Sequence, residues 1–196
     1  MMRGALLGGA LIAACSSSSG PASPKPGPEV PRVVHVDCTD GPGMGRGMGP
    51  GAGRMGRGEM GGMGMGSDMG RIHQLLGGHD KIARKVVELP DGIESWTTSS
   101  DPAVAATLGA HLGDMVARMK QGQLIHGFDP LFRKVFAAAP LIEVTVEPIA
   151  GGVHVIERGK TPEAIAIVRA HAQLVSWMAE RGFAEAHRCH DVAPAR

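Results

Sequence analysis

Aromatic side chains are scarce in this chain, which has four phenylalanines, two tryptophans and no tyrosine in 196 residues. Neither sign of charge is in excess, since Lys and Arg number 20 against 19 for Asp and Glu, which argues against an electrostatic nucleic-acid binder. Common enzyme motifs are also missing: there is no Gly-x-Ser-x-Gly, no His-Glu-x-x-His, and no phosphate- or dinucleotide-binding glycine loop in a strand-loop-helix context. The sequence therefore favours a binding or structural role over catalysis.

The first residues have the form of an export signal. Met1-Met2-Arg3 is a short positive start, and residues 4–14 are an apolar run too short for a membrane-spanning helix. The run ends in Leu11-Ile12-Ala13-Ala14-Cys15, which resembles the lipobox of bacterial lipoproteins. This resemblance implies a signal peptide over residues 1–14 and lipidation of Cys15, and Ser16 is similar to the residue found in outer-membrane lipoproteins that face the periplasm. An ordinary secretory signal with an incidental cysteine is the alternative.

Two low-complexity segments follow. Residues 15–40 are a Ser/Pro tether of the kind that holds a lipoprotein away from its membrane, and their end, Pro31 to Thr39, is expected as a loop or an edge strand. Residues 41–68 are rich in Gly and Met and predict a disordered arm. In composition the arm resembles Met-rich segments of periplasmic copper-handling proteins, because thioether sulfur favours Cu(I). Its candidate ligands are Met60, Met63, Met65 and Met69, and a spacer without any ligand is the alternative.

The remaining sequence contains one pattern twice, sixty positions apart. Asp101-Pro102 to Gly122 is a predicted helix with an N-cap, a proline in the first turn and a glycine stop, and Thr161-Pro162 to Gly182 repeats these features. Each is preceded by a predicted β-hairpin, and each hairpin by a shorter helix. The hairpins cover residues 85–98 and 141–157; the shorter helices run from Ile72 to at least His79 and from Asp129 to Phe136.

These units predict an α+β domain over residues 69–182, with units at 69–122 and 129–182. A lone hairpin is unstable in water, so we expect one four-stranded antiparallel sheet with helices on one face and a pseudo-twofold axis between the halves. Residues 183–196 are expected to fray. One pattern in the repeated segments resembles an uncharacterised extracytoplasmic bacterial family, and it consists of Leu89-Pro-x-Gly-Ile, Thr97, Asp101-Pro102 and His111. This resemblance implies no particular activity.

Matched histidines give the main site hypothesis. His111 and His171 occupy equivalent positions on the apolar faces of the two long helices, His79 lies on the apolar stripe of an earlier helix, and Met115 follows His111 by one turn. Imidazoles that face each other across a pseudo-twofold axis suit a transition metal or a haem iron. Copper is the first choice because of the Met-rich arm; haem is second because few aromatics are present to flank a porphyrin. Hydrogen-bonded core histidines in a structural or adaptor lipoprotein without a cofactor are the alternative.

The cysteines give a second, weaker hypothesis. With Cys15 lipidated, Cys38 and Cys189 remain, and they are either a disulfide or two unpaired thiols. His187, Cys189 and His190 form a short Cys/His cluster near the C-terminus, with His35 close to Cys38 at the other end. Such a cluster can bind Cu or Zn, although it also occurs by chance in terminal segments.

Overall fold

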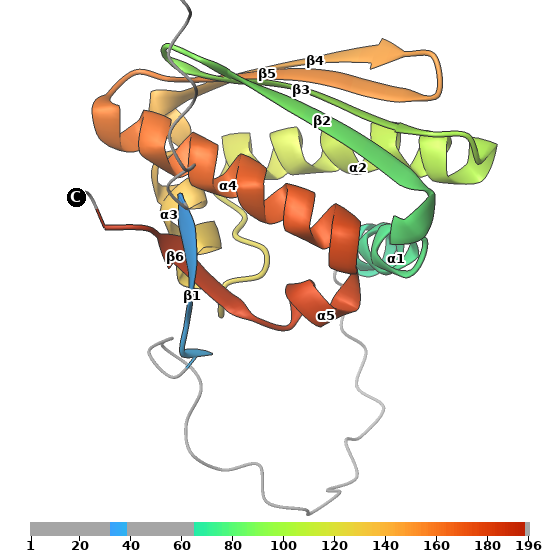
Figure 1. The fold of residues 1–196 in the computed structure, drawn as a ribbon, viewed down its shortest axis with the longest axis horizontal. Coiled ribbons are helices and arrows are strands. Elements are labelled where there is room, and N and C mark those ends of the chain that lie inside the picture. The colour runs from blue at the N-terminus through green and yellow to red at the C-terminus, as the bar shows by residue number, and fades with distance from the viewer. Residues whose placement is uncertain (1–31, 39–64, 195–196) are drawn as a thin grey trace, which may run out of the picture. The chain divides into compact units, whose positions relative to one another are not determined.

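Two β-hairpins build the larger sheet. The computed structural model describes residues 32–38 and 65–194; the signal peptide, Cys15, Met60 and Met63 lie outside the described residues. β2 (Ile82–Leu89) pairs with β3 (Gly92–Ser99), β4 (Ile142–Ile149) pairs with β5 (Gly152–Gly159), and β3 lies against β5. The order β2-β3-β5-β4 is antiparallel throughout (Figure 1). The predicted α+β class and four-stranded antiparallel sheet are confirmed.

Two glycines allow the hairpins to join. Gly92 begins β3 and Gly152 begins β5, so they lie near opposite ends of the ladder between these strands. A Cβ atom on Gly92 would overlap the carbonyl oxygen of Glu157, and one on Gly152 would overlap the carbonyl oxygen of Thr97. The two backbones therefore approach at a distance that excludes any side chain at these positions.

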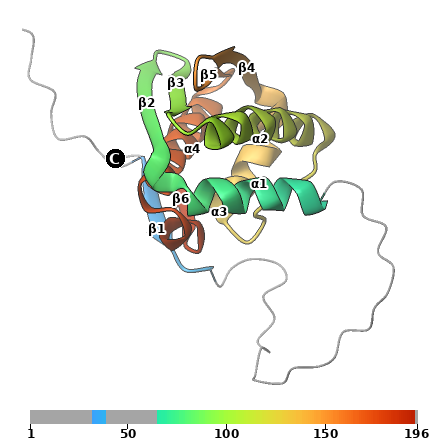
Figure 2. The ribbon, with the colours of Figure 1, turned by 90° about the vertical axis from the view of Figure 1, so that its right-hand side faces the viewer.

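Helices cover one face of this sheet. α2 (Pro102–Gln121) and α4 (Pro162–Arg181) both lie under it, α1 (Met65–Gly77) packs against α2, and α3 (Pro130–Ala137) packs against α4 (Figures 1 and 2). Short 3-10 turns, η2 (His79–Lys81) and η3 (Ala139–Leu141), lead into β2 and β4. Within the described ranges, no helix is both long enough and apolar enough to cross a membrane.

The long helices begin and end where the sequence predicts. The carboxylate of Asp101 accepts hydrogen bonds from the backbone N–H groups of α2, and the hydroxyl of Thr161 accepts one from α4. Gly122 ends α2 with a φ of 66°, a left-handed conformation that favours glycine. Equivalent elements also start sixty positions apart, since β4, β5 and α4 follow β2, β3 and α2 at that offset.

The first helix differs from its prediction at both ends. α1 starts at Met65, so residues 65–68 are helical and are not part of a disordered arm. The reason is a buried ion pair between helices: Arg118 on α2 donates from Nε and Nη2 to one carboxylate oxygen of Asp68, at 2.9 and 2.7 Å. At the other end, Gly77 closes the helix and Ile82 already belongs to β2.

A second, two-stranded sheet joins the two ends of the described chain. β1 (Val33–Val36) pairs antiparallel with β6 (Cys189–Val192), which follows the short helix α5 (Phe183–Ala186). The prediction that residues 183–196 fray is therefore wrong for α5 and β6. Val33 shows why, because its side chain packs into a buried cluster with Leu131, Val135, Ala170 and Leu174. Burying such side chains stabilises the fold by roughly 1.5–3 kcal/mol each.

Candidate metal centre

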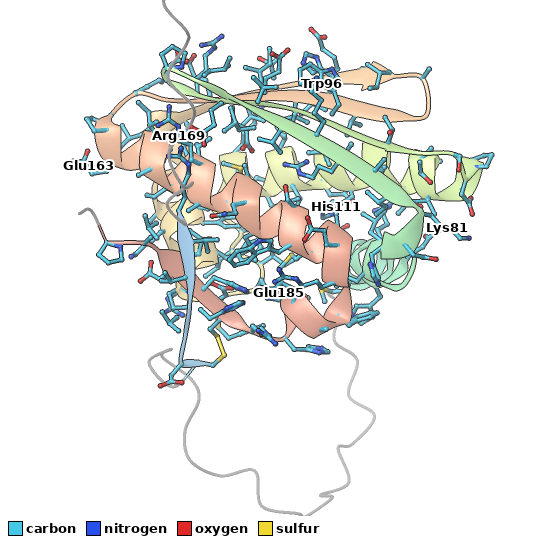
Figure 3. All side chains as sticks on the ribbon, viewed as in Figure 1. Lys81, Trp96, His111, Glu163, Arg169 and Glu185 are labelled. Carbon is cyan, nitrogen blue, oxygen red and sulfur yellow. A yellow bond between two sulfur atoms is a disulfide. The ribbon has the colours of Figure 1, made fainter. Side chains whose placement is uncertain are left out.

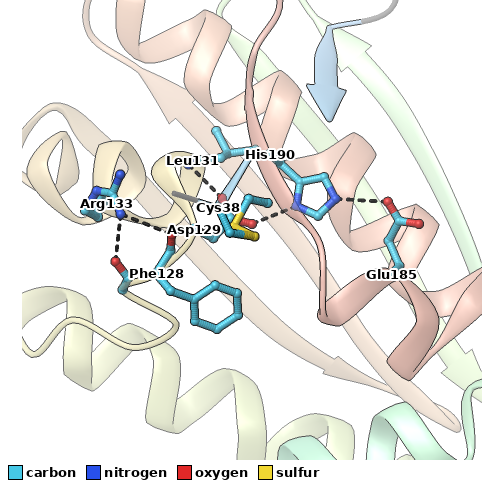
Figure 4. Close-up of a disulfide and its surroundings, with 9 residues drawn as sticks. Cys38, Phe128, Asp129, Leu131, Arg133, Glu185 and His190 are labelled. Atoms are coloured by element: carbon cyan, nitrogen blue, oxygen red, sulfur yellow. Dashed lines mark hydrogen bonds and ion pairs between the residues drawn. A yellow bond between two sulfur atoms is a disulfide. The ribbon is translucent and has the colours of Figure 1, made fainter. Parts of the chain in front are cut away.

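Three polar side chains converge where β1, β6 and α5 meet. His35 on β1 lies opposite His190 on β6 in the strand register, and both rings face Glu185 of α5. The Nε2 atoms of His35 and His190 lie 2.7 and 2.9 Å from the same oxygen, Oε1 of Glu185. These three atoms all lie within 4.8 Å of one another. The ring of His190 and the carboxylate of Glu185 are shown in Figure 4.

His190 is a buried cation. Its side chain has no exposed surface, and its two ring nitrogens face two carboxylates: Nε2 faces Glu185, and Nδ1 lies 2.7 Å from Oδ2 of Asp129. An ionised carboxylate can only accept hydrogen bonds, so both ring nitrogens donate and the ring carries a positive charge. Burial lowers the pKa of His190, but the hydrogen bonds to Asp129 and Glu185 outweigh this effect and raise the pKa above its ordinary value.

Glu185 is held as a carboxylate by three donors. Burial alone would raise its pKa, because its side chain is 1% exposed. Hydrogen bonds from His190, His35 and Arg181 act in the opposite direction and lower the pKa to about 2. Nη1 of Arg181 donates to the second carboxylate oxygen at 3.0 Å. Glu185 therefore offers the oxygen of a charged carboxylate as a ligand at physiological pH.

Asp129 connects this cluster to a helix. Its Oδ1 accepts a hydrogen bond from the backbone N–H of Leu131 at 2.8 Å and caps α3, while Oδ2 accepts from His190 (Figure 4). Both oxygens are thus occupied, and the ring of His190 is fixed in plane and orientation. A histidine that binds a metal through one ring nitrogen commonly donates the N–H of its other ring nitrogen to a carboxylate, as His190 does here to Asp129.

His35 is the solvent-facing member. Its side chain is 39% exposed, whereas its partners Glu185 and His190 are buried. One face of its ring stacks on Trp177 at 5.3 Å between centroids, and the guanidinium of Arg181 lies over the same indole at 5.1 Å. The cluster is therefore reached from solvent past His35, whose ring is packed against Trp177.

The donor set suits a divalent ion. Two imidazole nitrogens and one carboxylate oxygen are ligands that Zn²⁺ and Cu²⁺ accept, and three protein ligands leave a further position open. Around a tetrahedral ion with bonds of about 2.1 Å, the ligand atoms lie about 3.4 Å apart. His35 and His190 would have to move away from Glu185 by about 0.7 and about 0.5 Å, and each would exchange an N–H···O bond for a bond to the ion.

The histidines of the main hypothesis lie elsewhere and do not join a three-ligand group among the described residues. His111 is half-buried on α2, its Nδ1 is enclosed without a hydrogen bond, and burial lowers its pKa despite the opposing charges of Asp114 and Asp68 (Figure 3). Nδ1 of His171 lies 3.9 Å from a carboxylate oxygen of Glu157.

The other predicted ligands are also separate from the cluster. His79 lies in η2, where its Nδ1 is buried without a partner, and Met115 is half-buried on α2. Met69 is exposed at the surface of α1; the helix backbone includes Met65, whose side chain is outside the described part.

The terminal Cys/His hypothesis fits in part. His190 is at the centre of the cluster, and Cys38 and Cys189 form a disulfide with 5.3 Å between their Cα atoms. Cys189 is therefore not a free thiolate ligand. His187 is exposed and stacks on Phe183, away from the cluster.

Sequence reasoning missed Glu185 and Asp129 as site residues. Asp129 was predicted only as the first residue of the short helix, and this position before Pro130 was the available signal, because a capping carboxylate keeps one oxygen for another partner. Glu185 carried no signal, since its role depends on a strand pairing that joins residues more than a hundred positions apart.

Comparison of the chain with protein-family models, curated proteins and solved structures finds no match in any of the three.

Proposed function

We propose that this protein is an extracytoplasmic, lipid-anchored domain that binds a divalent transition metal ion through His35, Glu185 and His190. The observation that carries the proposal is the convergence of two imidazole nitrogens and one carboxylate oxygen within 4.8 Å, with Asp129 behind His190. Access past the exposed ring of His35 makes the ion exchangeable, as a binding or delivery role requires.

The donor chemistry favours copper as Cu²⁺, with Zn²⁺ as the alternative. A nitrogen and oxygen set binds Cu²⁺ more tightly than other divalent first-row ions, whereas Cu(I) prefers thioether sulfur. In this proposal the Met-rich arm, with Met60 and Met63, and the start of α1, with Met65 and Met69, are a separate collector of Cu(I). Neutral imidazole is the form that binds, so the buried imidazolium of His190 must release its Nε2 proton to the solvent. We expect about one proton released for each ion bound.

An internal duplication is the second part of the proposal. We infer that the chain repeats one helix-hairpin-helix unit, because equivalent strands and long helices start sixty positions apart. Such a repeat places His111 and His171 at equivalent positions near a pseudo-twofold axis. The enclosed, unpartnered Nδ1 of His111 and its lowered pKa suit a neutral ligand, so this pair is the second candidate site, for copper or haem.

The extracytoplasmic location is supported by the disulfide. The lipobox-like segment at Leu11 to Cys15 implies a lipoprotein, and a disulfide between Cys38 and Cys189 suits an oxidising compartment outside the cytoplasm. Resemblance of the repeated segments to an extracytoplasmic bacterial family points the same way. We place the domain at the outer membrane, facing the periplasm.

A structural or adaptor lipoprotein without a cofactor is the competing function. One observation favours it: without an ion, all three ligand atoms already make hydrogen bonds, so the cluster is a satisfied ionic network that fastens the chain ends. Metal binding has to replace these bonds, whereas a purely structural network has no reason to give them up.

Calorimetric titration of the full-length protein in detergent with Cu²⁺ and with Zn²⁺ separates the two functions. We expect one ion per chain at micromolar protein concentration, and a heat that varies with the ionisation enthalpy of the buffer because a proton is released. His35→Ala should weaken binding strongly while keeping the fold, since His35 is partly exposed. His187→Ala is the matched control, because His187 is an exposed histidine between α5 and β6 that is not one of the three ligands.

Three other results have defined meanings. Loss of binding in His111→Ala or His171→Ala, with His35→Ala unaffected, places the ion between α2 and α4. Absorption of a bound porphyrin at visible wavelengths identifies haem. Absence of binding for Cu²⁺, Zn²⁺ and haem in the wild type leaves the structural or adaptor function.

The lipid anchor has its own test. Cys15→Ala removes the only thiol that the lipobox-like segment offers for acylation, so the protein should move from the membrane fraction to the soluble fraction of the cell envelope. Incorporation of a labelled fatty acid should stop at the same time. Cys38→Ser is the control and should leave both measurements unchanged, and a Cys15→Ala variant that stays in the membrane contradicts the lipidation.

A further inference from the structure

His35 reaches the candidate centre only because β1 lies against β6. It is 150 positions away in sequence from Glu185, and residues 37–64 lie between its strand and α1 in the sequence. In the register, His35 lies opposite His190, and Val36 lies opposite Cys189. The centre is therefore assembled from both ends of the described chain, and whatever fixes β1 also fixes one of the three ligands.

Non-covalent contacts hold β1 weakly. Its ladder with β6 has only four residue pairs, and a two-stranded ladder is marginally stable by itself. The side-chain oxygen of Gln173 accepts hydrogen bonds from the backbone N–H groups of Arg32 and Val33, at 2.9 and 3.0 Å. Arg32 also pairs with Glu88, but both side chains are well exposed, and such pairs contribute little. Val33 in the core cluster and the bond of His35 to Glu185 add to these contacts, and the disulfide is the covalent tie.

The disulfide positions the ligands without being one of them. Successive side chains of a strand point to opposite faces, so Cys189 lies on the other face of the β1–β6 ribbon from His190 and from His35 opposite it. Bonded to Cys38, it closes the ribbon three residues beyond His35. The sulfur atoms thus fix the strand register while staying outside the group of metal ligands.

We propose that the Cys38–Cys189 disulfide makes metal binding conditional on an oxidising environment, so that opening the bond releases the ion. This inference rests on the proposed function of the centre. The reductant is a dithiol. One of its thiolates attacks the sulfur of Cys38, since Cys189 is 1% exposed, and the Cys189 thiolate leaves. The second thiol then displaces Cys38 and closes the reductant's own disulfide, so two electrons and two protons pass to the two cysteines.

Release follows from the loss of one ligand. Without the covalent tie, β1 leaves the ribbon for part of the time and takes His35 with it, while Glu185 and His190 stay on the body of the protein. The two remaining groups can then restore their own hydrogen bond. Even the loss of a supporting partner weakens metal sites by 10- to 100-fold, so we expect reduction to weaken binding by about tenfold or more.

Titration with Zn²⁺, which does not change its oxidation state, tests the inference on the full-length protein. The samples are the oxidised wild type, the wild type reduced with a dithiol and then desalted under argon, and the Cys38→Ser/Cys189→Ser variant. We expect the dissociation constant for Zn²⁺ to rise about tenfold or more in the last two. His35→Ala should weaken binding in the oxidised protein but have little further effect in the double-serine variant, because the two changes act on the same ligand.

The contrary outcomes are distinct from one another. Equal affinity in the oxidised protein and the double-serine variant, with His35 still required, overturns the inference and leaves the proposed function intact. If the reduced wild type binds Zn²⁺ more tightly but the double-serine variant does not, the freed thiolates are ligands. This outcome also overturns the inference. If the double-serine variant shows no cooperative thermal transition, the disulfide is needed for folding itself and its role is purely structural. This outcome also overturns the inference. No binding to the oxidised wild type instead removes the proposed function itself.

Discussion

His190 is a charged group without exposed surface, and the fold places a carboxylate on each of its ring nitrogens. Removing an ionised side chain from water costs several kcal/mol, and the cost is offset only when the partners have good geometry and no polar atom is left unsatisfied. Asp129 meets this condition by dividing its oxygens between α3 and His190, and Glu185 meets it with three donors. Such a network fixes one arrangement of side chains more than it adds stability.

Asp129→Asn tests the charge at this position while keeping the cap. Asn is as good an N-cap as Asp, so its carbonyl oxygen can still accept from the N–H of Leu131. Its NH₂ group then faces the Nδ1–H of His190, donor against donor, and one counter-charge is lost. We expect the free energy of unfolding, measured by urea denaturation, to fall by about 3–5 kcal/mol.

The control for this variant is Asp101→Asn. Asp101 caps α2 in the same manner, but its ion-pair partner, Lys81, is exposed, and such pairs contribute little to stability. Its replacement should leave the urea midpoint nearly unchanged. If both variants lose the same stability, the loss comes from the charge of a capping carboxylate in general, and the pairing of Asp129 with buried His190 adds nothing to it.

At the scale of elements, local chemistry made much of the fold predictable. The turn at Pro90-Asp91-Gly92, the caps Asp101 and Thr161 and the stop at Gly122 each specify a backbone conformation within a few residues. Because two hairpins in succession need neighbours to be stable, the four-stranded sheet follows from these local signals. The sheet, the long helices and their order were therefore accessible from the sequence.

The β1–β6 ribbon was not accessible, for a physical reason. Its strands have four residues each and no connecting turn, and the pairing joins positions that are more than 150 apart in the sequence. Such short apolar runs give the same pattern in a loop as in a strand. The start of α1 depends in the same way on a distant partner, the ion pair between Asp68 and Arg118.

In the candidate centre, too, some residues were predictable from local sequence and others depended on distant contacts. His190 and His35 attracted attention because histidine next to cysteine is a recognisable composition, but a carboxylate gives no comparable signal. Glu185 and Asp129 become ligand and support only after α5, β6 and the cap of α3 are brought together. Conversely, the matched spacing of His111 and His171 gave helix positions but not the direction or distance of their rings.

At the scale of the whole molecule, both ends of the described chain meet at one place. The disulfide, the strand ladder and the ionic network all join β1 to the segment after α4. Covalent closure over a separation of 151 residues restricts the unfolded chain strongly, in the loop-entropy description of disulfides. The network adds a contribution that depends on protonation, so the stability of the entire domain should vary with pH.

The sign of this dependence follows from two pKa shifts. Glu185 has its pKa lowered from an ordinary 4.5 to about 2, so the stability that it contributes is fully present above pH 4.5 and is lost as the pH falls towards 2. His190 has its pKa raised above an ordinary 6.5, so its contribution is fully present below pH 6.5 and is lost as the pH rises through the folded-state value. The network should therefore stabilise the protein most between these limits.

We expect the thermal midpoint of the metal-free protein, measured in a chelator between pH 2 and pH 9, to be highest between about pH 4.5 and 6.5. Glu185→Gln should flatten the acid side of this profile, and His190→Gln should flatten the alkaline side. His154 is the control for the alkaline side, because hydrogen bonds to Glu147 and Glu94 raise its pKa in the same direction on the sheet, where it is half-buried and Glu147 is exposed. His154→Gln should therefore leave most of the alkaline slope in place. If His154→Gln removes that slope while His190→Gln keeps it, the charge that stabilises the molecule lies on the sheet surface, and the buried network does not control its response to pH.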